Sequence, residues 1–306
     1  MALTLTEAAK LSNDILLQGV VETIIKDSPV LQNLPFIEIV GNGLTYNKEN
    51  ALPTIDFYDV GDTWQESTPT FTQVTASLCI MGGDADVDNF LKATRSNIQD
   101  IETAVIELKA KALRHSFEEK FIYGDAATST KEFSGIKKLI DTATASDQVI
   151  AMAATGATLT LAKIDELIDA VKGGKPDILL MSRRSRRKIN ALARAAGNNL
   201  EVGTGKLGEF VQLYNGIPIG VSDWILNTHT VADSVETLTT GSLCSTIYAL
   251  QFGEGSLAGL TSPGHITVEP IGALETKDAT RTRIKWYCSL ALFSAIKAAA
   301  LIGVKD

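Results

Sequence analysis

Residues 71–80 read FTQVTASLCI, and residues 90–123 read FLKATRSNIQDIETAVIELKAKALRHSFEEKFIY. The first segment alternates apolar and polar side chains from Val74 to Ile80, which predicts a half-buried strand. The second repeats apolar residues at intervals of three and four, which predicts an amphipathic helix. A helix over about 90–120 would be roughly 45 Å long at 1.5 Å per residue. That exceeds what most compact enzymes of this size need, and a long exposed rod usually serves as a strut.

The segment before this strand predicts a long projecting arm. Residues 36–40 (FIEIV) form a predicted strand, but residues 51–70 contain few apolar side chains and show no helical period. A loop of that length without a core of its own is usually functional or disordered. Because it is flanked by strands that can pair, it predicts a hairpin arm. Its Phe57, Tyr58 and Trp64 would then need a neighbouring chain to pack against, and a flexible surface loop is the alternative.

Composition narrows the class of protein. The chain has 306 residues, 45% of them hydrophobic and 21% charged, with a formal net charge of -8, so it is globular. The negative charge argues against a protein that coats nucleic acid with its whole surface. Three widely spaced cysteines, Cys79, Cys244 and Cys288, favour reduced thiols over a disulfide framework or a zinc site. The most apolar run, 289–304, is too short to span a membrane and contains Lys297.

The pattern of residues changes along the chain. Residues 1–35 predict either an N-terminal arm or a first helix packed on the body. From 141 to 255, helices and strands alternate as in an α/β lobe, and long alternating strands return over 256–306. We expect these strands to pair beside the 71–80 strand, beneath the long helix. The lobe at 141–255 would then be inserted into a second domain formed by two separate segments, the first of which is 36–140. This arrangement gives an α+β fold.

Motifs for catalysis or nucleotide binding are absent. The segment 203–207 (GTGKL) resembles a phosphate-binding loop, but that motif needs glycine at 200 and serine or threonine at 207, where this chain has leucine. The histidines are far apart and lack metal-ligand spacing; they are His115, His229 and His265. We place His115 on a solvated or interface face of the long helix. No catalytic or cofactor-binding residue is predicted.

Three aspartates, Asp84, Asp86 and Asp88, resemble the start of a calcium loop. The sixth position of that loop should be glycine and the twelfth glutamate, whereas this chain has Asn89 and Arg95. A position just before the long helix explains the aspartates better, because negative charge stabilises a helix N-terminus. No metal site is predicted.

The sharpest charge feature is the basic cluster Arg183, Arg184, Arg186, Arg187 and Lys188. Arg184, Arg187 and Lys188 share one helical face. Base-reading sites usually add interleaved aromatic residues or a known module, and neither is present. In a chain of net negative charge we therefore favour a salt-bridged contact between subunits. A solvated helix face and a nucleic-acid contact are the alternatives.

The order of these parts resembles the major capsid protein of tailed bacteriophages, which has the Hong Kong 97-type shell fold. The most specific stretch is FEEKFIYGDAATSTKEFSGI at 117–136, which is similar to the aromatic turn, Gly-Asp and polar loop that follow the long helix in that family. PDILLMSRRSRRKINAL at 176–192 resembles the family's strand-to-helix step. The resemblance covers nearly the whole chain.

The resemblance implies a role for each part. Residues 36–140 would begin the peripheral domain, with an extended loop at about 45–70 and a spine helix at about 90–120. Residues 141–255 would be the axial domain. Residues 256–306 would be the returning strands of the peripheral domain and a C-terminal segment, and residues 1–35 would be the N-terminal arm.

The resemblance also implies partners and location. Copies would form pentamers and hexamers of an icosahedral shell that encloses double-stranded DNA without sequence-specific binding. The shell would be the virion capsid, assembled in the host cytoplasm without a membrane. Because the chain starts with the arm, we expect either a separate scaffold protein or none, and we also expect a portal. Some members crosslink a loop lysine to a neighbour, and Lys48 is the nearest candidate. The predicted subunit-interface residues are Lys48, Phe57, Tyr58, Trp64, Arg183, Arg184, Arg187 and Lys188.

Two alternatives remain open at this stage. An encapsulin-like nanocompartment shell has the same fold and encloses cargo enzymes instead of a genome. A two-lobed α/β enzyme or binding protein is the other, and it would be a soluble monomer.

Overall fold

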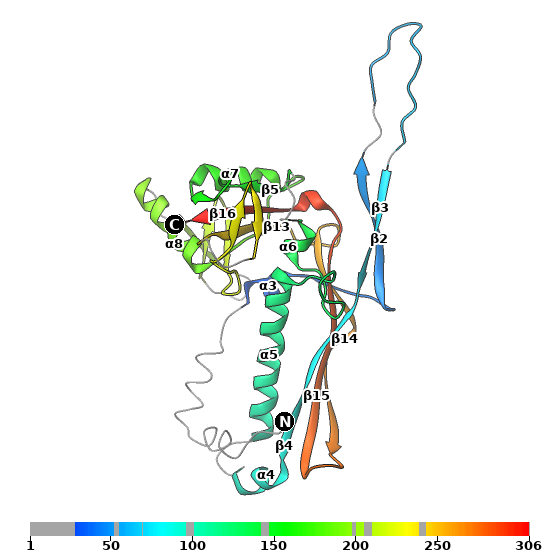
Figure 1. The fold of residues 1–306 in the computed structure, drawn as a ribbon, viewed down its shortest axis with the longest axis vertical. Helices are drawn as coiled ribbons and strands as arrows, with labels where there is room; N and C mark the ends of the chain where they lie inside the picture. The colour runs from blue at the N-terminus through cyan, green and yellow to red at the C-terminus, as the bar shows by residue number, and fades with distance from the viewer. Residues whose placement is uncertain are drawn as a thin grey trace.

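The computed structural model describes residues 28–51, 55–68, 70–95, 101–141, 147–197, 200–204, 210–238 and 243–305. Most of the predicted N-terminal arm therefore lies outside the described residues. Its last part is helix α3 (Pro29–Asn33), where the Ser28 hydroxyl oxygen accepts a hydrogen bond from the Leu31 N–H at 3.2 Å. Figure 1 shows three connected parts: a body with a mixed sheet, a long blade of sheet and helix, and a two-stranded arm that projects beyond both.

The blade is a four-stranded sheet that lies beside a long helix. In spatial order its strands are β1 (Phe36–Glu38), β14 (Leu257–Ala273), β15 (Ala279–Leu292) and β4 (Cys79–Asp88). Helix α5 (Ile101–Tyr123) runs along β4 and β15 (Figure 1). The centre of this contact is Phe117, which is fully buried and lies 4.7 Å from the Trp286 ring, centroid to centroid.

The helix predicted over 90–120 is found as two helices, α4 (Asn89–Arg95) and α5, and residues 96–100 between them lie outside the described residues. The aspartates expected before the helix lie mostly within β4. Their alternate neighbours Ala85 and Val87 face the helix, so Asp84 and Asp86 point to the opposite face of the sheet. Only Asp88 supports a helix start, by accepting the Phe90 N–H at 2.9 Å.

A compact loop closes α5 and explains the Gly-Asp stretch of the sequence. Gly124 donates to the Lys120 carbonyl at 2.8 Å, and Gly135 donates to the Gly124 carbonyl at 2.8 Å. A Cβ atom on either glycine would collide with backbone oxygens, so both positions require glycine. Between them, the Asp125 carboxylate accepts the Ala127 N–H at 2.9 Å, and helix α6 (Ile136–Leu139) follows.

The arm is a hairpin of β2 (Gly43–Ala51) and β3 (Thr70–Ser77). The hairpin prediction is confirmed, but the expected pairing of the 36–40 strand with the 71–80 strand is wrong. The residues at 71–80 belong to two strands, because the chain passes from the arm into the blade at Leu78 and continues as β4. Strand β15 pairs with β4, as expected for the returning strands.

The body contains an eight-stranded sheet. Seven strands lie in the spatial order β5 (Val149–Ala151), β16 (Ala298–Lys305), β13 (Ser245–Leu250), β7 (Ile178–Met181), β10 (Ile217–Val221), β9 (Phe210–Tyr214) and β8 (Glu201–Thr204). The eighth, β6 (Ala157–Thr158), also pairs with β16. The other elements are α7 (Leu161–Ala170), α8 (Arg183–Ala195), the hairpin β11 (Thr230–Ala232) and β12 (Val235–Thr237), and the 3-10 turn η1 (Ala295–Lys297).

Alternate side chains of the central strands point to opposite faces of the sheet, and different elements pack on each face. Leu180 of β7 packs in the cluster that contains Phe121 of α5, whereas Leu179 packs with Ile164 of α7 and Ile189 of α8. Since both faces are covered, β7 is apolar at every position, as its sequence predicts. The predicted elements at 160–171, 177–181 and 183–196 are confirmed.

One boundary differs from the expectation. The range 256–306 does not act as one set of blade strands, because β16 lies between β5 and β13 in the body sheet. In its sequence AAALIGVK, every residue except Lys305 is uncharged and buried. A strand in the centre of a sheet covered on both faces has this composition.

Candidate functional site

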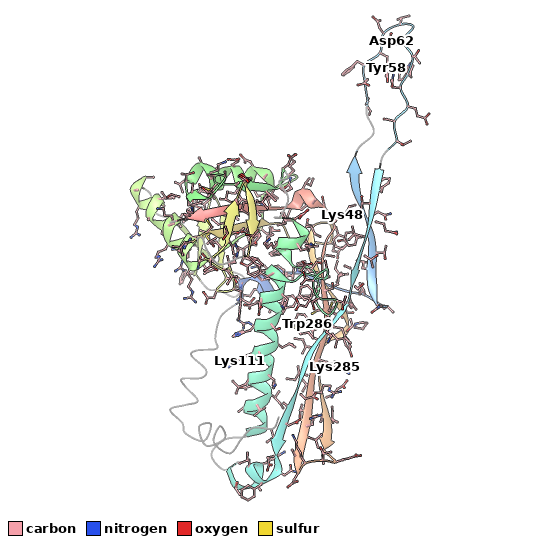
Figure 2. The ribbon with its side chains drawn as sticks, in the orientation of Figure 1. Lys48, Tyr58, Asp62, Lys111, Lys285 and Trp286 are labelled. Carbon is pink, nitrogen blue, oxygen red and sulfur yellow. The ribbon has the colours of Figure 1, made fainter. Side chains whose placement is uncertain are left out.

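The arm presents large apolar side chains to solvent. Beyond the paired residues of β2 and β3, residues 55–68 form an irregular tip in which Phe57 is fully exposed and Trp64 is 78% exposed. Tyr58 is half-buried because its ring stacks on Trp64 at 4.5 Å, and its hydroxyl oxygen accepts the Gln65 N–H at 3.0 Å. Figure 2 shows Tyr58 and Asp62 far from the body. The tip therefore combines a defined Tyr58–Trp64 contact with large apolar surface that is open to solvent.

The arm is anchored at its base. The Tyr46 ring lies 4.8 Å from Phe293, where the chain leaves the blade. Burial raises the pKa of the Tyr46 hydroxyl and lowers the pKa of the Lys48 ammonium. Lys48 is half-buried on the arm between base and tip (Figure 2), in a position from which it can contact a neighbouring chain. The described residues do not test a crosslink.

The basic cluster begins α8, and its members have different environments. Arg183 forms a bidentate pair with Asp223, one contact of which measures 2.8 Å between Nη2 and Oδ2. Arg184 donates to the carbonyl oxygens of Leu243 and Val304. Both side chains are engaged within their own chain. Arg187 is exposed and Lys188 is half-exposed, and both stay candidates for contact with another subunit.

A groove lies beside this helix. Its volume is about 730 Å³, and it is bounded by α3, β9 and β10. Phe210, Leu213 and Pro218 supply apolar walls, and Arg186 supplies a charged one. Sequence reasoning missed the groove, because its walls come from three separate parts of the chain.

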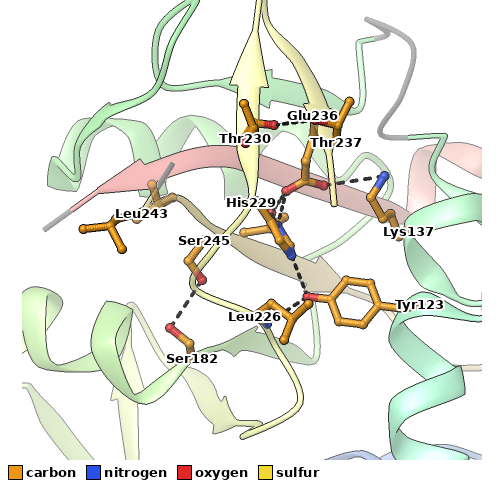
Figure 3. Close-up of polar contacts among 12 residues, drawn as sticks. Tyr123, Lys137, Ser182, Leu226, His229, Thr230, Glu236, Thr237, Leu243 and Ser245 are labelled. Carbon is orange, nitrogen blue, oxygen red and sulfur yellow. Dashed lines mark hydrogen bonds and ion pairs between the residues drawn. The ribbon is translucent and has the colours of Figure 1, made fainter. Parts of the chain in front are cut away.

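A buried polar network joins the end of α5 to the body (Figure 3). His229 is fully buried; its Nδ1 lies 2.6 Å from Glu236 Oε1, and its Nε2 lies 3.0 Å from the Tyr123 hydroxyl. Thr246 donates to the same Glu236 oxygen, and Lys137 Nζ lies 3.9 Å from Oε2. Burial, with a smaller contribution from Glu236, raises the pKa of Tyr123.

The sequence alone does not reveal this network. Its members come from α5, α6, β12, β13 and, for His229, the residue just before β11, and no spacing in the chain connects them. Burying a carboxylate is costly unless it is paired, and here it is surrounded by a lysine, a hydroxyl and an imidazole. His115 lies on α5, as expected, with intermediate exposure, and its ring centroid is 5.6 Å from that of Trp224. The side chain of His265 lies outside the described residues.

The outer face of the blade carries a ladder of ion pairs. Arg281 binds both oxygens of Asp86, at 2.6 and 2.7 Å, and Arg283 binds both oxygens of Asp84, at 2.7 and 2.9 Å. Hydrogen bonds from these arginines hold the pKa values of both aspartates below their ordinary value. Lys285 Nζ extends the ladder to Glu269 at 2.6 Å. The aspartates thus bind arginine across a strand pair.

Other functional classes find little support. Among the described residues, no group of three or more His, Cys, Asp or Glu side chains has a metal-binding arrangement. No helix in the described part of the chain is long and apolar enough to cross a membrane. The rejected phosphate-loop segment begins in β8, and residues 205–209 lie outside the described ranges.

Comparison with known proteins identifies the family. The family model for the SU10 major capsid protein matches residues 61–301. The chain belongs to the SU10 major capsid protein family. It is a major capsid protein, a subunit whose copies build an icosahedral shell. No curated protein matches the chain in sequence.

Solved structures agree in fold. The SrpI encapsulin of Synechococcus elongatus PCC 7942 has a TM-score of 0.67 at 17% identity, over 100% of this chain and 97% of that one. The capsid of the empty GTA particle has a TM-score of 0.67 at 13% identity, over 92% of each chain. A protein of Mycobacterium phage Bobi has a TM-score of 0.64 at 16% identity, over 100% of each chain.

These likenesses confirm the Hong Kong 97-type capsid fold expected from the sequence. At such low identity they show the fold alone, and the encapsulin and the GTA capsid match this capsid protein equally well by TM-score. The match to the SU10 major capsid protein family therefore favours a capsid protein over an encapsulin. A capsid family consists of structural proteins, so membership favours shell assembly over the two-lobed enzyme.

Proposed function

We propose that copies of this chain assemble as pentamers and hexamers into the icosahedral shell that encloses the double-stranded DNA genome of a tailed phage. The observation that carries this proposal is the arm. It extends beyond the body and ends in Phe57 and Trp64, which are exposed in the single chain. Exposed apolar groups of this size on a monomer favour a contact with another molecule.

In this proposal each part has a role in the shell. The arm, at about 45–70, is the extended loop that lies over a neighbouring subunit, and α5 is the spine of the peripheral domain. The body, with its eight-stranded sheet, is the axial domain at the five-fold and six-fold positions. Arms that reach neighbouring copies let weak single contacts add up through multivalency.

The enclosed DNA needs no specific site. A net charge of -8 disfavours tight adhesion of the genome to the protein. A portal and a separate scaffold protein are the further partners that the resemblance to tailed-phage capsid proteins implies. The shell would assemble in the host cytoplasm and persist in the virion.

Electron microscopy of the purified protein tests this function. The full chain should form closed particles of uniform size, and a chain lacking residues 50–68 should remain a folded subunit without closing shells. A full chain that stays monomeric under all assembly conditions would contradict the proposal. Particles isolated from the natural source should contain nuclease-protected DNA; particles filled with a protein cargo would support the encapsulin alternative.

A further inference from the structure

Helix α8 carries charge for which the described part of its own chain offers no ion-pair partner. Its basic residues are Arg183, Arg184, Arg186, Arg187, Lys188 and Arg194, and it has no acidic residue. Arg183 and Arg184 have partners within the chain. Arg186, Arg187 and Lys188 have no ion-pair partner among the described residues. We call these last three residues and the adjoining groove the α8 surface.

The arm tip, residues 55–68, has the opposite charge. Its acidic residues are Asp56, Asp59, Asp62 and Glu66, and it contains no lysine or arginine. Asp59 and Asp62 stabilise the turn, because their carboxylates accept backbone N–H groups at 2.7 Å. Asp56 and Glu66 are exposed, and the described part of the chain offers them no cationic partner.

The groove of the α8 surface suits an aromatic side chain. Pockets that bury apolar groups usually measure about 300–1,000 Å³, and this one measures about 730 Å³. Phe210 and Leu213 form apolar walls, and Arg186 brings positive charge to the same groove. Asp177 also lines it, but one of its carboxylate oxygens already accepts the Phe252 N–H at 2.7 Å.

We propose that the arm tip of one copy docks on the α8 surface of a neighbouring copy. Trp64 enters the groove, and Asp56 and Glu66 lie against Arg186 and Arg187. An aromatic anchor in a desolvated pocket supplies most of the binding energy in such interfaces, and the surrounding charges set register and partner. The two surfaces complement each other in both respects.

The location of the two surfaces determines the kind of assembly. In Figure 1 the arm and α8 lie on opposite sides of the molecule, with the body sheet between them. One chain therefore cannot bring its own tip to its own α8 surface. A contact between two different surfaces is head-to-tail, and repeated contacts of this kind form a ring when the rotation between neighbouring copies closes on itself. The inference rests on the proposed shell function and names the contact that would join copies within one ring.

Charge reversal with rescue tests the contact. Asp56→Lys with Glu66→Lys reverses the arm tip, and Arg186→Glu with Arg187→Glu reverses the α8 surface. We expect each pair alone to lower the yield of closed particles at least tenfold, while circular dichroism shows folded subunits. All four substitutions together should restore particles. Assembly of the unaltered chain should weaken with salt, because exposed charges are screened beyond about 8–10 Å at physiological ionic strength.

A matched control separates local pairing from net charge. The reversed arm tip combined with Lys131→Glu and Lys172→Glu has the same net charge as the fourfold variant, but the new acidic groups lie at exposed sites that belong neither to α8 nor to the lining of the groove. This combination should not restore particles. Rescue by the control, normal assembly of either single-surface variant, or failure of the fourfold variant would overturn the proposal. Normal shells with reduced DNA content would assign the α8 surface to nucleic acid.

A disulfide experiment does not depend on the reversed variants. Trp64→Cys with Phe210→Cys should give, after mild oxidation of assembled particles, a covalent ladder that ends at the ring size. Trp64→Cys with Lys131→Cys should give none. Cys244 and Cys288 are buried and Cys79 is half-buried, and the unaltered chain serves as the blank for them. Particles that form without this ladder would refute the contact but leave the shell function intact, whereas a failure of the unaltered chain to assemble would count against the function itself.

Discussion

The centre of the body sheet and the tip of the arm are opposite extremes of one molecule. Every residue of β7 and of β13 is buried, and their side chains pack against helices on both faces. At the tip, Phe57 is fully exposed, and Trp64 is 78% exposed with its ring stacked on Tyr58. This difference in burial indicates that the two regions have different roles. The body and blade hold the subunit together, and we propose that the arm contacts another copy.

The largest expected effect on stability comes from replacing phenylalanine with alanine, once in the buried contact between α5 and the blade and once at the arm tip. Phe117→Ala removes a fully buried ring that packs against Trp286, and should lower the free energy of unfolding by about 3–5 kcal/mol. Phe57→Ala makes the same chemical change at the exposed tip, and should leave that free energy within about 0.5 kcal/mol of the unaltered subunit. Urea unfolding of both variants checks the pair, and equal losses would contradict the division of tasks.

A smaller decrease in the free energy of unfolding is expected where the spine helix α5 meets the body. Tyr123→Phe removes the hydroxyl that contacts His229 and accepts the Leu226 N–H at 2.9 Å. Leaving these buried groups unsatisfied should cost about 1–3 kcal/mol of unfolding free energy. Tyr214→Phe is the control, because its hydroxyl bonds an Asp165 carboxylate at an exposed site. If both variants unfold alike, the network does not stabilise the joint.

The ion-pair ladder predicts an acid dependence. The folded pKa of Asp86 is lowered, so its pairing with Arg281 stabilises the fold above the ordinary carboxyl pKa of about 3.9 and is lost as pH falls through the folded value. Asp86→Asn should therefore melt at a lower temperature than the unaltered subunit at pH 7, and the gap should narrow as the pH falls below the ordinary carboxyl pKa. We expect a smaller effect than at Tyr123, since the face is open to solvent. A gap that persists at low pH would show that the pair is not its source.

The sequence predicts those features that depend on local periodicity. Helix α8, strand β7 and the hairpin arm follow from their own residues, and so does the exposure of Phe57. Features that depend on distant pairing were wrong or missed. The strand at 71–80 has one unbroken period, and nothing local marks Leu78 as the point where the chain leaves the arm. Strand β16 is apolar at nearly every position, and its place in the body sheet follows from contacts made about fifty residues away.

The candidate surfaces likewise combine features that the sequence predicts with features that only the structure shows. The basic cluster is visible in the sequence, but only the structure shows that Asp223 engages Arg183 and that Arg186 lines a groove. The groove and the His229 network are built from segments far apart in the chain. Periodicity in a single sequence does not encode such neighbours.

The measurement that tests the central claim most directly is amide hydrogen exchange of the isolated subunit and of the assembled particle. Strands β7 and β13 should be protected in both states, because their hydrogen bonds belong to the fold of one chain. The amides of residues 55–68 should exchange rapidly in the subunit and become protected on assembly. An arm tip that is already protected in the subunit, or that still exchanges rapidly in closed particles, would contradict the account.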